Sequence, residues 1–179
     1  MSWGAVIVRV VVGGLFVGHG LQKLNGSFNG PGLEGTEKMM ESLEMEPAKT
    51  NALAVSLAET GAGAAIVAGA ATPLAAGGLI ASMVTAIRKV HAKNGVWNSN
   101  GGFEYNAVLI AVLTALAAEG PGKASFDALF GKARWGAKGA LTALALGIGG
   151  SIAAVEMGRR TAEKKSAESG GDLGGTAEG

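Results

Sequence analysis

The stretch Trp3–Leu24, WGAVIVRVVVGGLFVGHGLQKL, is an apolar segment that is long enough to cross a membrane and that closes with polar residues. A membrane-spanning helix needs about 20 predominantly apolar residues, and this stretch meets that requirement. Its last turns carry His19, Gln22 and Lys23. These three groups are either the solvated end of a helix or one wall of a binding site.

The composition favours closely packed membrane helices. The chain has 179 residues, of which 31 are Gly, and its charged fraction of 16% lies below the roughly 25% of a typical soluble domain. A net charge of +1 gives no reason to expect nucleic-acid binding, and the lack of cysteine excludes disulfides and thiol chemistry. Two histidines are too few for a histidine-rich metal centre, which leaves His plus carboxylate as the alternative, and no metal site is predicted. We expect a multi-pass protein of the cell membrane, with a soluble Ala/Gly-rich bundle as the alternative.

Four further apolar segments follow the first one. They cover residues 52–71, 74–87, 105–118 and 139–155. The two middle segments of the chain, 74–87 and 105–118, reach spanning length only if the charged residues beside them lie inside the helices. The pattern predicts an all-α integral membrane protein, an antiparallel four-helix bundle with an extra C-terminal helix.

The same pattern predicts how the chain is divided. We expect a four-helix membrane domain over residues 1–127, then a linker and an additional apolar helix over 128–158, and a disordered polar tail over 159–179. Residues 36–45 form a short amphipathic helix, either on the surface or as a lid over a site. If 139–155 spans, as we expect, the basic residues place the end reached by the first helix in the cytoplasm.

Alternation of the spans brings polar residues to one end of the bundle. We call the end where the chain begins side A and the opposite end side B. Side B receives His19, Gln22, Lys23, Glu59, Arg88, His91, Glu104 and Tyr105. With a rise of 1.5 Å per residue, His19 and Glu59 lie at similar depths. Arg9, near side A, is interpreted as an interfacial anchor.

Glu59 is the most informative single residue, because an acidic group inside an apolar span costs a few kcal/mol. It should face the bundle and pair with His19, Lys23 or Arg88. Such a group serves either a proton relay or an ion pair that only fixes packing. On the first segment, glycines share a face with Lys23, which indicates a face that approaches another helix.

Several motifs together resemble the DoxX family of small four-helix membrane proteins. They are RVVVGGLFVGHGLQKL, NGPGLEGTEKMMESLEM, LAETGAGAAIVAG and the long stretch that begins NGVWNSNGGFEY. The resemblance covers about Val8 to Asp127. It implies an integral membrane protein linked to respiratory-type redox chemistry, as a subunit of a quinone-linked oxidoreductase system.

A quinone reaction would need hydrogen-bond donors, a proton acceptor and an apolar pocket. We predict Glu59 and His19 as the catalytic pair. The predicted quinone-binding residues are Gln22, Lys23, Arg88, His91, Trp97, Glu104 and Tyr105. The chain itself carries no cofactor motif, so quinone is the only cofactor considered. The alternatives are a non-enzymatic anchor for a soluble redox partner protein, and a pathway for protons or small solutes.

Overall fold

The computed structural model describes residues 3–172, with side chains described through residue 168. This part of the chain is helical apart from its connecting loops and contains no strand. The main helices are α1 (Trp3–Asn25), α2 (Gly32–Ser42), α3 (Ala48–Ala68), α4 (Thr72–Ala86), α5 (Glu104–Glu119), α6 (Phe126–Leu129) and α7 (Gly136–Asp172). Short turns are η1 (Ser27–Asn29), the π-helical η2 (Ile87–His91), η3 (Ala92–Asn94) and η4 (Asn98–Asn100).

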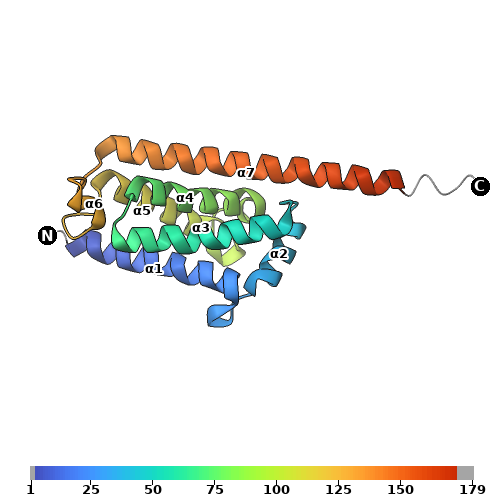
Figure 1. The fold of residues 1–179 in the computed structure, drawn as a ribbon, viewed down its shortest axis with the longest axis horizontal. Helices are drawn as coiled ribbons and strands as arrows, with labels where there is room; N and C mark the ends of the chain where they lie inside the picture. Colours follow the sequence, from blue (N-terminus) through green and yellow to red (C-terminus); the bar gives the residue numbers. More distant parts are fainter. Residues whose placement is uncertain (1–2, 173–179) are drawn as a thin grey trace, which may run out of the picture.

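The helices form an antiparallel bundle whose long axis runs along α1, α3, α4, α5 and α7 (Figure 1). The N-terminal end and α6 lie at side A, whereas α2 lies at side B. Within residues 3–172, four helices are long and apolar enough to cross a membrane, namely Trp3–Asn25, Ala48–Ala68, Thr72–Asn94 and Gly136–Glu168. Large apolar side chains such as Ile7, Leu57 and Val108 are exposed on the outside, where lipid would cover them. The predicted all-α membrane bundle with an extra C-terminal helix is confirmed.

The two short apolar segments differ in how they reach across the bundle. The helix that begins with α4 continues through η2 and η3 to Asn94, so Arg88 and His91 lie within it, as the length argument required. In contrast, α5 begins at Glu104 and has 16 residues, which gives about 24 Å of helix. It is shorter than the roughly 30 Å hydrocarbon core of a bilayer. Its buried face packs against α4 and α7.

Glycines allow α1 and α3 to cross closely. A Cβ at Gly13 would lie 2.6 Å from the carbonyl oxygen of Gly63, and a Cβ at Gly20 would lie 2.5 Å from the backbone nitrogen of Thr60. Neither position accepts a side chain without separating the two helices. The prediction that the glycine face of the first segment approaches another helix is confirmed, and this contact sets the register of Lys23.

The predicted C-terminal boundary at residue 159 is wrong. α7 is one continuous helix of 37 residues, about 55 Å long, and it runs through to Asp172. Ion pairs one turn apart support its polar half: Glu156 pairs with Arg159 and Arg160, and Arg159 also pairs with Glu163. The first half of α7 packs along α4. Residues 173–179 of the predicted tail lie outside the described residues.

The interpretation of Arg9 as an interfacial anchor is also wrong. Arg9 is buried, and its guanidinium donates to the carbonyl oxygens of Pro121 at 2.6 Å, Ala124 at 3.0 Å and Val67 at 3.1 Å. These carbonyls belong to the end of α3 and to the loop after α5, where no helix satisfies them. Arg9 therefore ties that loop to the bundle at side A.

Asp127 performs the corresponding task at the start of α4. Its carboxylate accepts from the backbone nitrogens of Ala71 at 2.7 Å and Thr72 at 3.0 Å, from the Thr72 hydroxyl at 2.8 Å and from the Trp135 indole at 3.2 Å. Burial raises the pKa of Asp127, but these bonds outweigh burial and hold the pKa below its usual value. The ionised carboxylate satisfies the free N–H groups of the helix end.

Candidate functional site

The side-B ends of the helices surround a cavity of about 500 Å³ with a largely apolar wall. The wall comes from α1, α2, α3, α4, α5 and α7. Five of the predicted site residues line it: His19, Lys23, Glu59, His91 and Tyr105. Residues far apart in the sequence thus share one space, as alternation of the spans suggested.

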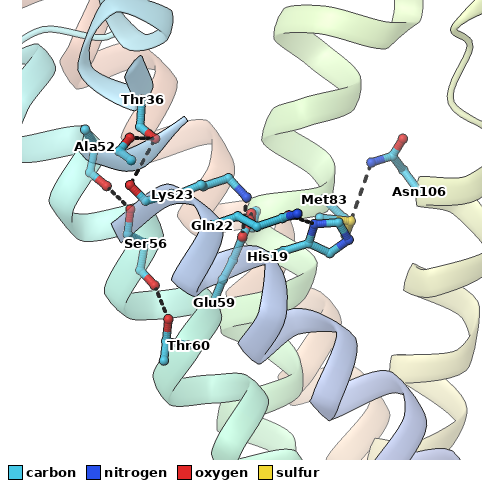
Figure 2. A network of polar contacts seen from close by, with 12 residues as sticks. His19, Gln22, Lys23, Thr36, Ala52, Ser56, Glu59, Thr60, Met83 and Asn106 are labelled. Atoms are coloured by element: carbon cyan, nitrogen blue, oxygen red, sulfur yellow. Dashed lines mark hydrogen bonds and ion pairs between the residues drawn. The ribbon is translucent and has the colours of Figure 1, made fainter. Parts of the chain in front are cut away.

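A buried ion pair forms the polar centre of this cavity (Figure 2). The Lys23 ammonium reaches across from α1 and pairs with the Glu59 carboxylate on α3. The Glu59 side chain is 3% exposed and that of Lys23 is 21% exposed, so only the cation keeps contact with the surroundings. Of the three partners considered for Glu59, the structure selects Lys23.

The second oxygen of Glu59 has a partner that the sequence did not suggest. The Ser82 hydroxyl on α4 donates to Glu59 Oε1 at 2.5 Å. Because Lys23 and Ser82 hold different oxygens, the carboxylate links three helices in one polar contact. A lone serine in an apolar segment commonly donates to a carbonyl oxygen of its own helix, so the sequence did not predict that Ser82 would bind Glu59.

His19 lines the cavity but bonds along its own helix. Its Nδ1 lies 3.0 Å from Gln22 Oε1, and both groups lie beside the ion pair in Figure 2. Gln22 itself does not line the cavity. The other ring nitrogen of His19, Nε2, has no hydrogen bond among those found for the described residues, which leaves it available for a ligand.

The end of α1 is held in place by α2 and α3. The Thr36 hydroxyl donates to the carbonyl oxygens of Lys23 at 3.2 Å and Gly32 at 2.8 Å, which fixes the start of α2 to the last turn of α1. On α3, the Ser56 and Thr60 hydroxyls donate within their own helix at 2.6 Å and 2.8 Å. The polar groups around Lys23 are therefore already satisfied, and the ammonium is directed to Glu59.

The amphipathic helix predicted for residues 36–45 covers part of the cavity. Met39 and Met40 of α2, together with Leu43 and Met45 just after it, line it. Met40 and Met45 are buried. Methionine side chains are unbranched and adaptable, which suits a wall that must accommodate an apolar ligand. Of the two alternatives for this helix, the position over the site matches the lid.

The opposite wall contains a histidine and an amide. His91 Nδ1 lies 2.8 Å from the Gly101 carbonyl oxygen, which can only accept, so Nδ1 donates. Asn106, on α5, is buried and its Nδ2 lies 3.4 Å from the Met83 sulfur. Sequence reasoning missed Asn106, although an amide within the apolar α5 was an available signal.

Four predicted binding residues do not line the cavity. Besides Gln22, Arg88 points to α7 and donates to the Ser151 carbonyl oxygen at 3.0 Å. Trp97 is 64% exposed in the loop before α5. Glu104 accepts from the Asn98 backbone nitrogen at 3.1 Å and so closes that loop. The alternation of the spans predicted the correct end of the bundle for these residues. It could not predict in which direction each side chain points.

The DoxX family model matches residues 4–92, which include α1, α2, α3, α4 and the π-helical η2. The chain belongs to the DoxX family. No curated protein and no solved structure matches it.

The DoxX match covers most of the residues that line the side-B cavity. It covers less of the chain than the sequence motifs that resemble the family. It ends at residue 92, so it includes His19, Lys23, Glu59 and His91. Helices α5, α6 and α7 lie beyond it, although the resemblance had been expected to extend to Asp127. The ion pair and the lid therefore belong to the DoxX part, whereas α7 closes the cavity from outside that part. In the described residues, no group of three or more His, Asp and Glu side chains is placed to hold a metal ion.

Proposed function

We propose that this DoxX protein binds a quinone in the side-B cavity, as a membrane subunit of a quinone-linked oxidoreductase system in the cell membrane. The observation that carries the proposal is the buried Lys23–Glu59 pair beside an apolar cavity of about 500 Å³. Small-molecule sites are mostly apolar cavities of roughly 300–1,000 Å³ with a few convergent polar groups. A flat, lipid-soluble ring with polar carbonyl oxygens matches this combination.

The residues present fit the two parts of a quinone. The methionines of α2 and the apolar residues of α1 and α4 would contact the ring. Lys23 and Tyr105 carry donors for the carbonyl oxygens, and His19 carries a ring nitrogen not used within the chain. A bound quinone supplies the two-way exchange of electrons and protons, with the electrons coming from a redox partner protein. Glu59 and His19 are the groups that would hold or pass the protons.

The distribution of basic residues supports a cytoplasmic location for side B. The Lys165 ammonium lies 2.8 Å from Glu46 near the start of α3, so the end of α7 is at side B. Side B then carries Lys23, Lys38, Lys49, Arg88, Lys89, Lys93, Arg159, Arg160, Lys164 and Lys165. The five other basic residues belong to side A, and one of them, Arg9, is buried. An excess of Lys and Arg marks the cytoplasmic side.

The proposal is tested by quinone binding with a matched control. The protein is purified in detergent and titrated with decylubiquinone, and bound quinone is measured after equilibrium dialysis. Lys23→Met should weaken binding about tenfold or more, because it removes the cation and a donor at the cavity. Lys38→Met removes a lysine from an exposed ion pair with Glu34 and should bind like the wild type. Equal binding by both variants, or none by the wild type, would overturn the proposal.

A separate measurement tests the catalytic part of the proposal. In a preparation with quinol turnover, Glu59→Gln should lower kcat, because the amide accepts the Ser82 hydroxyl but cannot carry a proton. Unchanged turnover would remove Glu59 from catalysis and leave a binding role.

The projecting half of α7 favours a second candidate function, that of an anchor for a soluble redox partner. Figure 1 shows the helix running past the other helices at side B. Its charged residues there are exposed, as Arg160 illustrates at 70%. Co-purification of a partner that is lost on removal of residues 160–179, together with a protein that binds no quinone, would favour the anchor.

The buried carboxylate favours a third candidate, a pathway for protons or small solutes. Glu59 lies beside the cavity and is reached by one cation and one hydroxyl. Reconstituted vesicles that move protons without any redox substrate would support this pathway, and vesicles that do not would count against it.

A further inference from the structure

A second cavity lies at side A, at the opposite end of the bundle from the proposed quinone site. It has a volume of about 720 Å³ and lies between the start of α4, α6 and the start of α7. Both α4 and α7 begin a candidate membrane span here, at Thr72 and Gly136. The cavity therefore lies at the height where a bilayer changes from hydrocarbon to headgroups.

The cavity combines an apolar wall with basic side chains. Its apolar part includes Leu74, Phe126 and Phe130, which are 60%, 54% and 70% exposed. The two phenylalanine rings lie 5.6 Å apart between their centroids. Such a large exposed aromatic surface on a membrane protein is covered by acyl chains or by a partner.

Three cations line the same cavity, namely Lys132, Arg134 and Lys138. The Lys132 ammonium lies 5.5 Å from the centroid of the Trp135 ring, which orients it. Arg134 has only an exposed contact with Glu119, at 3.2 Å. In the part of the chain that the structure describes, Lys138 has no ion-pair partner.

The one acidic residue in the lining does not oppose an anion as a free carboxylate would. Asp127 accepts four bonds, from Ala71, Thr72 and Trp135, so both of its oxygens are occupied. It also holds the Trp135 ring in the wall through the indole N–H. The remaining charge of the lining is positive.

We propose that this side-A cavity binds an anionic phospholipid. The phosphate lies among Lys132, Arg134 and Lys138, and an acyl chain follows Leu74, Phe126 and Phe130. Charge complementarity favours an anionic phospholipid over the other occupants. The headgroup of a zwitterionic lipid carries a cation that the basic side chains would repel, and an apolar helix carries no anion for them to bind. Each Lys or Arg near an anionic membrane surface adds a preference of about fivefold for anionic headgroups.

Trp135 allows a direct test. Trp3 and Trp97 are changed to Phe, so that Trp135 is the only tryptophan. The protein is placed in vesicles of phosphatidylcholine and phosphatidylglycerol, in which one lipid or the other carries brominated chains that quench tryptophan fluorescence. At low phosphatidylglycerol content, brominated phosphatidylglycerol should quench Trp135 at least about fivefold more per lipid than brominated phosphatidylcholine.

The variants decide whether the preference belongs to the cavity. Lys132→Gln with Lys138→Gln should abolish the preference, and both side chains are exposed, so the fold is not at risk. Lys49→Gln with Lys93→Gln removes the same charge from exposed positions at side B and should leave it intact. Equal quenching by the two lipids, or equal loss in both pairs of variants, would overturn the proposal. Protection by millimolar inorganic phosphate alone would also overturn it, because the site would then select a free anion.

Discussion

Separating the charges of the Lys23–Glu59 pair should destabilise the protein far more than removing both charges together. Lys23→Met leaves the Glu59 carboxylate at 3% exposure with the Ser82 hydroxyl as its remaining partner. Breaking a buried ion pair in this way costs about 3–5 kcal/mol. The lower end applies here, because the Lys23 side chain keeps 21% of its exposure. We therefore expect a loss of about 3 kcal/mol.

The double variant, Lys23→Met with Glu59→Gln, carries neither charge and should lose only about 1–2 kcal/mol, because buried pairs are often replaceable by neutral groups. The coupling free energy from the full cycle is then about 2 kcal/mol or more, measured by reversible SDS unfolding in mixed micelles with helicity as the signal. The control cycle uses Lys38→Met and Glu34→Gln, an exposed pair at 2.8 Å, for which about 0.3–0.5 kcal/mol is expected. A coupling energy no larger than that of the control would refute the reasoning.

Three further predictions concern packing, pH and orientation. Gly20→Ala should lower the free energy of unfolding by about 1–3 kcal/mol, because the added Cβ would lie 2.5 Å from a backbone nitrogen of α3. In the control Gly14→Ala the added Cβ meets nothing within 4 Å, so this variant should be neutral or slightly stabilising. Equal melting temperatures of the two variants would contradict this prediction. Because folding lowers the pKa of Asp127, its contribution to the free energy of unfolding is complete above the unfolded pKa of about 3.9 and is lost as pH falls through the folded pKa. Asp127→Asn should therefore flatten the dependence of stability on pH below about pH 4. An unchanged dependence would count against this prediction. The chain has no native cysteine, so an impermeant maleimide on intact cells should label Ala137→Cys and not Ala167→Cys if side B is cytoplasmic, and the reverse pattern would invert the orientation.

The arrangement of the spans and the polar end of the bundle could be predicted, because both follow from counting antiparallel helices. Glu59 was expected to face the bundle, since burial without a partner is too costly, and Lys23 was among its three candidate partners. The choice among them depends on helix register. That register is set by the close contact of Gly20 with α3, which a single sequence does not give to within one residue.

Other features could not be predicted because they depend on loops and neighbours. The position of Arg9 near the end of an apolar segment is typical of an interfacial anchor. It becomes a buried donor only because the loop at 121–124 folds against it. The polar half of α7 has the composition of a tail, yet its charges are spaced to pair along a helix, and its Lys165 pairs with Glu46 just before α3. In both cases the local sequence pattern pointed to a different role, and a tertiary contact decided the outcome.

Photolabelling with an azidoquinone tests the central claim, that the side-B cavity binds a quinone, most directly. The purified protein is illuminated with the probe and digested, and the labelled residues are located by mass spectrometry. The account predicts labels on cavity residues such as Met40 and Met83. Excess decylubiquinone should suppress these labels, and they should be strongly reduced in Lys23→Met but not in Lys38→Met. Labels confined to lipid-facing residues such as Val108, and unaffected by excess decylubiquinone, would contradict it.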